Sequence, residues 1–163
     1  MNFKYKRDRV LWKFVHEELR RQVSELDAYS KATYGAGILI TSTVRTFKEQ
    51  REINRKALAI NPDYRASFPS VHNFGNGVDV GRHNDKGLAW PTKHIQSLGR
   101  WFAKEFPYKH GNKSSCIFHT GTAPHLHLQL NMRIYGIGID QNSEHGALQI
   151  KQAILGLDDP SLE

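Results

Sequence analysis

The chain has 163 residues, of which 23 are lysine or arginine and 16 are aspartate or glutamate, so its formal net charge is +7. We expect residues 1–163 to form one domain, because this length suits a single hydrophobic core. The positive charge favours acidic partners such as nucleic acid, anionic lipid or the anionic polymers of a cell wall. Cys116 is the single cysteine, which excludes an internal disulfide framework and a multi-cysteine zinc site.

The N-terminal stretch, MNFKYKRDRVLWKFVHEELRRQ, has no uncharged apolar run. It therefore predicts neither a signal peptide nor a membrane-spanning helix. We expect the protein to be cytoplasmic when made and not to insert into a membrane.

Apolar spacing predicts helices and strands that alternate irregularly along the chain. Such a pattern indicates an α+β fold, with a small, mostly antiparallel sheet flanked by helices. The expected elements in chain order are a helix over 8–28, a strand over 37–45, a helix over 47–59, an irregular stretch containing Pro62 and Pro69, a strand over 77–80, a helix opened by Pro91, strands over 115–119 and 125–130, and a helix over 144–155.

The segment PHLHLQL, residues 124–130, places histidines on one side of a predicted strand. Side chains alternate between the two faces of a strand, so Leu126 and Leu128 point into a core while His125 and His127 point the other way. Two parallel imidazoles suit either a metal ion or an acid–base pair. Half-exposed surface histidines are the alternative for this segment by itself.

The segment SVHNFGNGVDV, residues 70–80, offers two further candidate ligands. His72 can meet Asp79 only if the chain reverses between them, and Gly75 and Gly77 permit the backbone angles of such a reversal. Two ligands from one turn and a third from a distant strand are typical of catalytic zinc, which keeps one position for water. The alternative is a structural turn with an exposed His72.

The segment TSTVRTFKEQ, residues 41–50, places Arg45 at the end of a predicted strand. A fixed guanidinium near a polarised carbonyl would stabilise the negative oxygen that forms during peptide hydrolysis. An ordinary surface arginine is the alternative.

Together these three segments resemble a known family. SVHNFGNGVD resembles the S-x-H-x-x-G-x-A-x-D signature of the D-alanyl-D-alanine carboxypeptidases and L-alanyl-D-glutamate endopeptidases, zinc enzymes that cut the peptide stems of bacterial cell walls and include many phage endolysins. STVRTFKEQ is similar to their S-G-Y-R-S-x-x-x-Q segment, with Arg45 and Gln50 in register. HLHLQL is similar to the H-x-H strand of the wider fold group, which includes lysostaphin-type and penicillin-insensitive murein endopeptidases. The matches span residues 38–130.

The resemblance implies a role for each matching position. His72, Asp79 and His127 would bind Zn²⁺, and His125 would act as general base or as a hydrogen-bond donor to the transition state. Arg45 would hold the oxyanion. A second register, in which His125 is the ligand and His127 lies behind it, stays open. The remaining matched polar residues, expected near the ligand turn and the substrate, are Ser70 and Gln50.

The sequence departs from the family pattern at two places. Gly77 replaces the alanine of the signature. Many relatives also carry Glu or Asp three residues before the last histidine ligand, where this chain has Thr122 or Pro124, depending on the register. Three explanations follow: His125 is the base, a carboxylate from elsewhere such as Asp140 or Glu144 replaces it, or catalysis is lost.

The sequence thus predicts a monomeric zinc peptidase that hydrolyses an amide bond in peptidoglycan stem peptides, as an endopeptidase or a D,D-carboxypeptidase. It would act on the wall after release from the cell or as part of a virion. One alternative is a non-catalytic, zinc-containing module that binds the wall or builds a virion. A metal-dependent nuclease is less well supported, because tandem carboxylates for two Mg²⁺ ions and a basic-aromatic stripe are both missing, and we expect no nucleic-acid partner.

Overall fold

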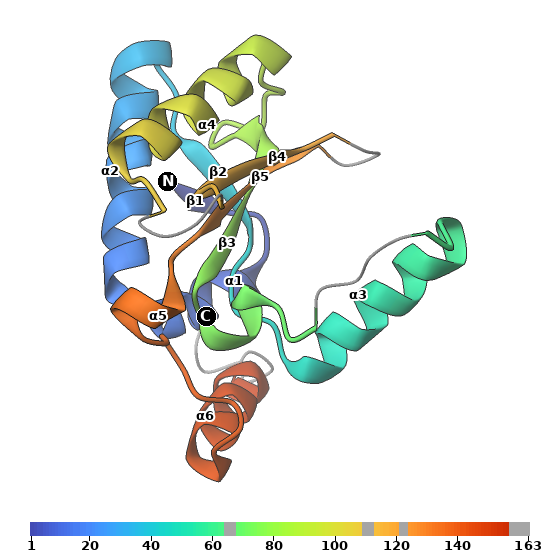
Figure 1. The fold of residues 1–163 in the computed structure, drawn as a ribbon. Helices are drawn as coiled ribbons and strands as arrows, with labels where there is room; N and C mark the ends of the chain where they lie inside the picture. The colour runs from blue at the N-terminus through green and yellow to red at the C-terminus, as the bar shows by residue number, and fades with distance from the viewer. Residues whose placement is uncertain (64–67, 109–112, 121–123, 157–163) are drawn as a thin grey trace.

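The computed structural model describes residues 1–63, 68–108, 113–120 and 124–156, and it has an α+β architecture (Figure 1). Its five-stranded sheet has the order β1-β2-β3-β5-β4, in which β1 runs parallel to β2 and every other pair is antiparallel. The expected fold class is confirmed. The elements are β1 (Asn2–Phe3), α1 (Lys6–Leu11), η1 (Trp12–Phe14), α2 (Glu17–Tyr34), β2 (Ile38–Ser42), α3 (Phe47–Ile60), η2 (Val71–Phe74), β3 (Gly77–Asn84), α4 (Thr92–Glu105), β4 (Cys116–His119), β5 (His125–Gln129), α5 (Met132–Tyr135) and α6 (Glu144–Leu155).

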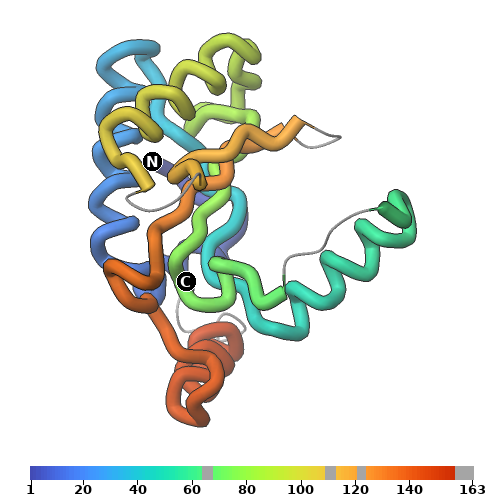
Figure 2. Tube along the Cα trace, in the orientation of Figure 1, coloured from blue at the N-terminus to red at the C-terminus, as the bar shows by residue number. Residues whose placement is uncertain are grey.

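One face of the sheet is covered by α2 and α4, as Figures 1 and 2 show. Alternate residues of the two central strands, Val78 and Val80 in β3 and Leu126 and Leu128 in β5, are fully buried on that side. From the helices, the side chains that complete this core include Leu19, Val23, Leu26, Ile95, Leu98 and Phe102. Burial of these apolar surfaces drives the layers together.

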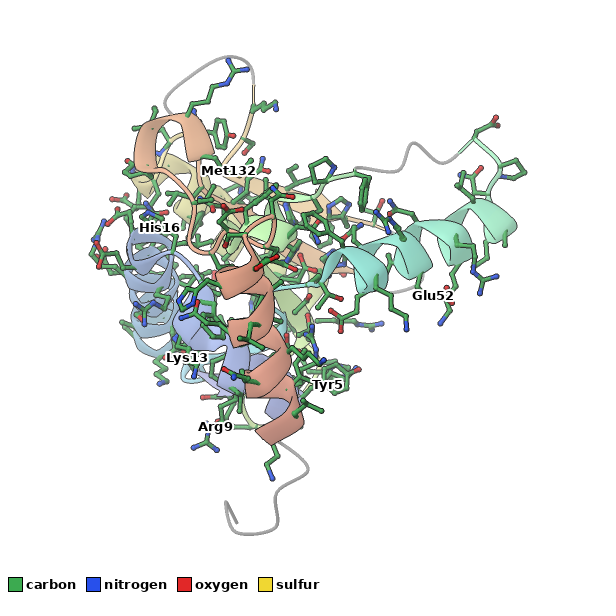
Figure 3. All side chains as sticks on the ribbon, turned by 90° about the horizontal axis from the view of Figure 1, so that it is seen from below. Tyr5, Arg9, Lys13, His16, Glu52 and Met132 are labelled. Atoms are coloured by element: carbon green, nitrogen blue, oxygen red, sulfur yellow. The ribbon has the colours of Figure 1, made fainter. Side chains whose placement is uncertain are left out.

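Helix α3 lies on the other side of the sheet. It projects from the body in the same direction as β4 and β5, which form one edge of the sheet (Figure 2). Helix α3 begins with a capping box, in which Thr46 and Glu49 each bond the other's backbone amide. Its buried residues are polar, Gln50 and Asn54, and not apolar. Figure 3 shows the helix reaching away from the rest of the chain, with Glu52 on it.

The helix expected over 8–28 is wrong as one element. The chain forms α1, η1 and then α2, and Val15 between them is extended. The break is stabilised at His16, whose amide donates to the Gly75 carbonyl at 2.8 Å and whose ring accepts from the amide of Glu18 as the cap of α2. A long-range contact therefore overrides the continuous helical pattern of the sequence.

The other predicted elements agree with the structure to within a few residues, and α6 matches its predicted bounds. β3 continues to Asn84, beyond the short strand expected over 77–80. The short elements β1, η2 and α5 were not predicted, because two to four residues carry too little periodicity to register. No described helix is apolar over a length that could cross a membrane.

The two glycines of the 70–80 segment serve different purposes. Gly75 has φ of +71°, the left-handed region that a reversal needs, as expected. Gly77 does not have a positive φ, so the expectation that it supplies turn angles is wrong. It is small for a steric reason, because a Cβ there would meet Val71 Cγ2 at 2.7 Å and the His72 amide nitrogen at 3.2 Å.

Gly75→Ala should destabilise the protein much more than Gly35→Ala. Both glycines have φ of +71°, so each substitution brings a left-handed backbone cost of about 1–2 kcal/mol. A Cβ at Gly75 would also meet the Phe14 carbonyl oxygen at 2.2 Å, whereas nothing lies within 4 Å at Gly35. We expect a loss of about 3 kcal/mol or more for Gly75→Ala in urea unfolding. Equal losses in the two variants would contradict this close approach.

Candidate functional site

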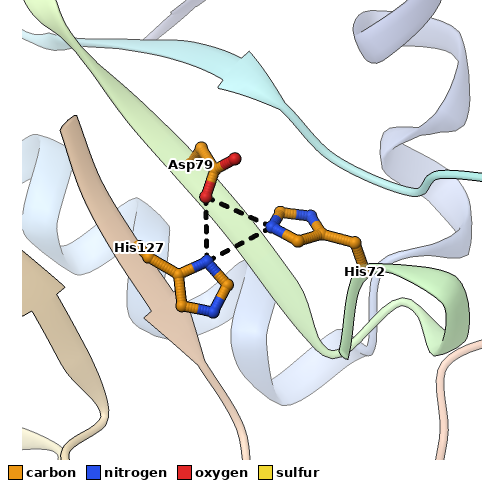
Figure 4. Close-up of side chains that lie close together, drawn as sticks. All are labelled: His72, Asp79 and His127. Carbon is orange, nitrogen blue, oxygen red and sulfur yellow. Dashed lines mark hydrogen bonds and ion pairs between the residues drawn. The ribbon is translucent and has the colours of Figure 1, made fainter. Parts of the chain in front are cut away.

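Three side chains from separate elements meet on the face of the sheet away from α2 and α4 (Figure 4). His72 comes from η2, Asp79 from β3 and His127 from β5. His72 Nε2 lies 3.2 Å from Asp79 Oδ1 and 3.2 Å from His127 Nδ1, and the latter lies 2.9 Å from Asp79 Oδ1. One ligand atom from each residue lies within 4.8 Å of the other two, so the cluster could hold a metal ion.

Strand register brings Asp79 and His127 together. They are direct partners in the antiparallel β3–β5 pair, and partners across a ladder point to the same face. The leucines that flank His127, Leu126 and Leu128, are fully buried on the opposite side. The alternation expected for PHLHLQL is therefore confirmed.

His72 is oriented by the backbone of the neighbouring strand end. Its Nδ1 lies 2.6 Å from the Thr43 carbonyl oxygen, which can only accept a hydrogen bond, so Nδ1 carries the proton. The Nε2 lone pair then faces Asp79 and His127. Such a bond from the remote ring nitrogen is the usual support for a metal-ligating histidine. Thr43 is itself held by Asp8, whose Oδ1 accepts from its amide at 2.8 Å and its hydroxyl at 2.9 Å.

Burial and charge set the protonation of the cluster. Burial of the ring, which is 1% exposed, lowers the pKa of His72 and outweighs the opposing effect of Asp79. Burial by itself would raise the pKa of Asp79, but His72, His127 and Arg45 together hold it well below its usual value. The site therefore presents a carboxylate beside a neutral His72 near pH 7.

A metal cation accounts for the three converging ligand atoms better than a proton does. A proton on His127 Nδ1 satisfies the contact with Asp79 and leaves His72 Nε2 without a donor of its own. A cation bound between the three atoms satisfies all of them. Two imidazole nitrogens and one carboxylate oxygen are ligands that Zn²⁺ takes in catalytic sites.

Arg45 lies beside this cluster, in direct contact with Asp79. Its Nη2 donates to Asp79 Oδ2, its Nε donates to Ser42 Oγ at 2.9 Å, and its Nη1 donates to Gln50 Oε1 at 3.3 Å. The guanidinium is thus held on three sides by fixed acceptors, which gives it one orientation.

Gln50 is buried and its amide is used inside the protein. While Oε1 accepts from Arg45, Nε2 donates to Asn54 Oδ1 at 2.9 Å one helical turn further along α3. Arg45 therefore determines which end of the Gln50 amide faces it, because a guanidinium can only donate and the opposite orientation would bring two donors together. Substrate binding by Gln50 stays a prediction.

His125 lies at the edge of the cluster, and His127 rather than His125 converges with the other two residues. The Nε2 of His125 is 3.9 Å from Asp79 Oδ1, and the side chain of His125 is 30% exposed, compared with 13% for His127. The His125 ring stacks on His119 of β4, with centroids 4.7 Å apart. His125 is therefore closer to solvent than the three convergent residues, and its role as an acid–base group stays a prediction.

Ser70 caps the turn that carries His72. Its hydroxyl accepts from the His72 amide at 3.4 Å, and its own amide donates to Asn73 Oδ1 at 2.8 Å. Asn73 also donates to the Arg45 carbonyl at 2.9 Å, which joins the turn to the start of α3. A contact between the buried Ser70 and a substrate stays a prediction.

The two carboxylates considered as replacements lie outside the cluster. Asp140 is exposed and accepts from the Asn142 amide, and Glu144 is exposed in the first turn of α6. Among the described residues, neither belongs to the possible metal-binding group of His72, Asp79 and His127. Thr122 falls outside the described residues.

Sequence reasoning missed several residues that support the site. Thr43 acts through its carbonyl oxygen, and Gln141, whose side chain donates to the Arg45 carbonyl at 2.7 Å, is a distant residue, so no local pattern marks either one. His119 could have been found. The two predicted strands 115–119 and 125–130 form a hairpin, and its register places His119 opposite His125.

Comparison with known proteins supports the fold. No protein-family profile matches the chain, and no curated protein sequence matches it. Among solved structures it is similar to the crystal structure of the L-Ala D-Glu endopeptidase ChiX from Serratia marcescens, with a TM-score of 0.53 and 21% identity. The match covers 83% of this chain and 94% of that chain. The two chains share a fold. This α+β fold is the one that the motif resemblance implied.

Arg45→Met should destabilise the metal-free protein by about 2 kcal/mol or more, because it removes a hydrogen-bonded counter-ion from the buried Asp79. Arg55→Met is the matched control. Arg55 pairs with Glu52 on the exposed side of α3, where such an ion pair contributes little to stability. Urea unfolding in the presence of a chelator measures both, and similar small losses would show that Arg45 is not needed to stabilise Asp79.

Proposed function

We propose that this protein is a zinc-dependent peptidase that hydrolyses an amide bond in the peptide stems of peptidoglycan. The observation that carries the proposal is the convergence of His72, Asp79 and His127 within 4.8 Å. The fold shared with an L-Ala D-Glu endopeptidase and the matching motifs of the sequence support the same class of reaction. Both an endopeptidase and a D,D-carboxypeptidase are consistent with these features.

Zinc would be held by His72 Nε2, His127 Nδ1 and the Asp79 carboxylate. When bound, it supplies Lewis acidity that polarises the scissile carbonyl and makes water a better nucleophile near neutral pH. The hydrogen bond from His72 Nδ1 to Thr43 keeps the ligating nitrogen unprotonated.

His125 and Arg45 would perform the remaining steps. His125, half-buried beside the cluster, accepts the proton of the attacking water and passes it to the nitrogen of the leaving amine. Arg45 donates hydrogen bonds to the carbonyl oxygen as it becomes negative. Since three acceptors already fix the guanidinium, little reorganisation is needed at that moment.

The net charge of the protein favours a reaction at the bacterial cell wall. The net charge of +7 would draw the protein toward anionic wall polymers, an attraction that weakens as salt is added. We further propose that residues 1–163 act as one monomeric domain that reaches the wall after release from the cell or within a virion.

A non-catalytic wall-binding module is the second candidate function, because Pro124 stands where many relatives carry the catalytic carboxylate.

Single histidine variants should separate metal binding from catalysis. His72→Ala and His127→Ala should lose zinc affinity by about a hundredfold or more, since each removes a ligand. His125→Ala should keep zinc and lose about 10²–10⁴-fold in turnover, as expected for removal of a general base. His145→Ala, an exposed histidine of α6, is the control. Calorimetric zinc titration measures affinity, and loss of zinc in His125→Ala with retention in His127→Ala would reverse the roles.

Incubation with purified sacculi tests the reaction itself. We expect soluble fragments whose masses correspond to stem peptides cut at one amide bond, and no fragments after chelation of the metal. Mass spectrometry of the supernatant identifies the bond. Stable binding to sacculi without released fragments would support the non-catalytic module, and cleavage of DNA in a parallel gel would support the nuclease.

A further inference from the structure

We infer that a cavity at the N-terminus of α4 binds an organic oxyanion, that is, a carboxylate or a phosphate ester. The cavity has a volume of about 330 Å³ and is lined by Arg82, Trp90, Thr92, Phe118 and Thr120 among others. Phe118 pairs with Leu126 across β4 and β5 on the helix-covered face of the sheet, whereas Asp79 and His127 face the other way. The cavity is therefore separate from the candidate metal centre, and the inference does not depend on the proposed peptidase function.

A buried donor without a partner is the first observation. Trp90 is 6% exposed, and within the described part of the chain its Nε1 is a buried nitrogen that has no hydrogen-bond acceptor. Buried indole N–H groups normally find an acceptor, because an unmade hydrogen bond costs about 1–3 kcal/mol. Trp90 is among the residues that line the cavity, so a ligand bound there could supply the acceptor.

The start of helix α4 is the second observation. This helix has 14 residues, and its N-cap, Pro91, provides no side-chain hydrogen bond. The first amide that bonds back to Pro91 is that of His94, so the amides of Thr92 and Lys93 belong to the set that a helix leaves unsatisfied at its start. Thr92 lines the cavity. Unsatisfied amides and the positive end of the helix dipole favour an anion.

Charge completes the chemistry of the cavity. Arg82 is exposed and, as far as the described residues show, has no ion pair, and the residues that line the cavity include no carboxylate. The Arg82 carbonyl accepts from the Trp90 amide at 2.8 Å, which fixes the two residues next to each other. Guanidinium, indole and amide groups are all donors, so the matching ligand must offer several acceptors.

The apolar part of the lining selects an organic ion over a bare one. Phe118 and Ile95 form part of the wall, and Pro124 lies at its edge. A ligand with a short carbon skeleton would bury that skeleton against these groups while its oxygens meet the donors. A carboxylate of a peptide and a phosphate ester of an anionic polymer share this chemistry.

Nuclear magnetic resonance on the isotope-labelled full chain tests the site directly. The probes are acetate for a carboxylate, sn-glycerol 3-phosphate for a phosphate ester, and glycerol as the neutral control. We expect the Trp90 indole N–H resonance and the amides of Thr92 and Lys93 to shift saturably with a millimolar dissociation constant for at least one anion, and not with glycerol. The anion that binds more tightly identifies the source.

Matched arginine variants complete the test. Arg82→Gln should weaken anion binding at least tenfold, because it removes the charged donor from an exposed position without disturbing the core. Arg100→Gln removes the same charge from an exposed position on α4 that does not line the cavity, and should bind like the original protein. The absence of saturable shifts with either anion up to about 50 mM would falsify the inference. Equal weakening in the two variants would also overturn it, by showing a general charge effect.

Discussion

The site depends on one buried contact, in which His72 Nε2 and His127 Nδ1 approach Asp79 Oδ1 and each other on the face of the sheet away from α2 and α4. Lone pairs at such distances repel each other unless a proton or a metal cation lies between them. The surrounding protein nevertheless holds His72 and His127 in place with hydrogen bonds and strand register. The three groups are thus preorganised as a candidate ligand set.

Several hydrogen bonds from the N-terminal third of the chain hold the turn that carries His72. Asp8 in α1 binds Thr43, whose carbonyl oxygen orients the His72 ring. The break between α1 and α2 exists because the His16 amide bonds to Gly75 within the same turn. These contacts join the turn to segments that are distant in the sequence.

Helix α3 supports the site from the other side through polar contacts. Gln50 and Asn54 form a hydrogen-bonded row that ends at the Arg45 guanidinium. The same helix exposes Ile53, Leu58 and Ile60 toward its free end. Helix α3 contributes little to the hydrophobic core, and its buried residues are polar. We infer that it supports the site more than it stabilises the fold.

The sequence by itself indicated the fold class and the candidate residues of the site. Period-two alternation in HLHLQL placed His127 opposite a buried leucine face, and the histidine, glycine and aspartate spacing of residues 70–80 marked a tight turn between two candidate ligands. These are local signals, since they follow from the geometry of single strands and turns.

Only the tertiary structure decided which histidine converges, what orients it and where the first helix stops. His125 and His127 are equivalent in the alternation of one strand, and the register against Asp79 separates them. The Thr43 carbonyl, the Gln50–Asn54 amides and the His16–Gly75 bond join residues that are near only after folding or that have no distinctive side-chain pattern. Long-range hydrogen bonds leave no periodicity in a sequence, and for that reason the chain's local pattern could indicate the candidate ligands but not the residues that support them.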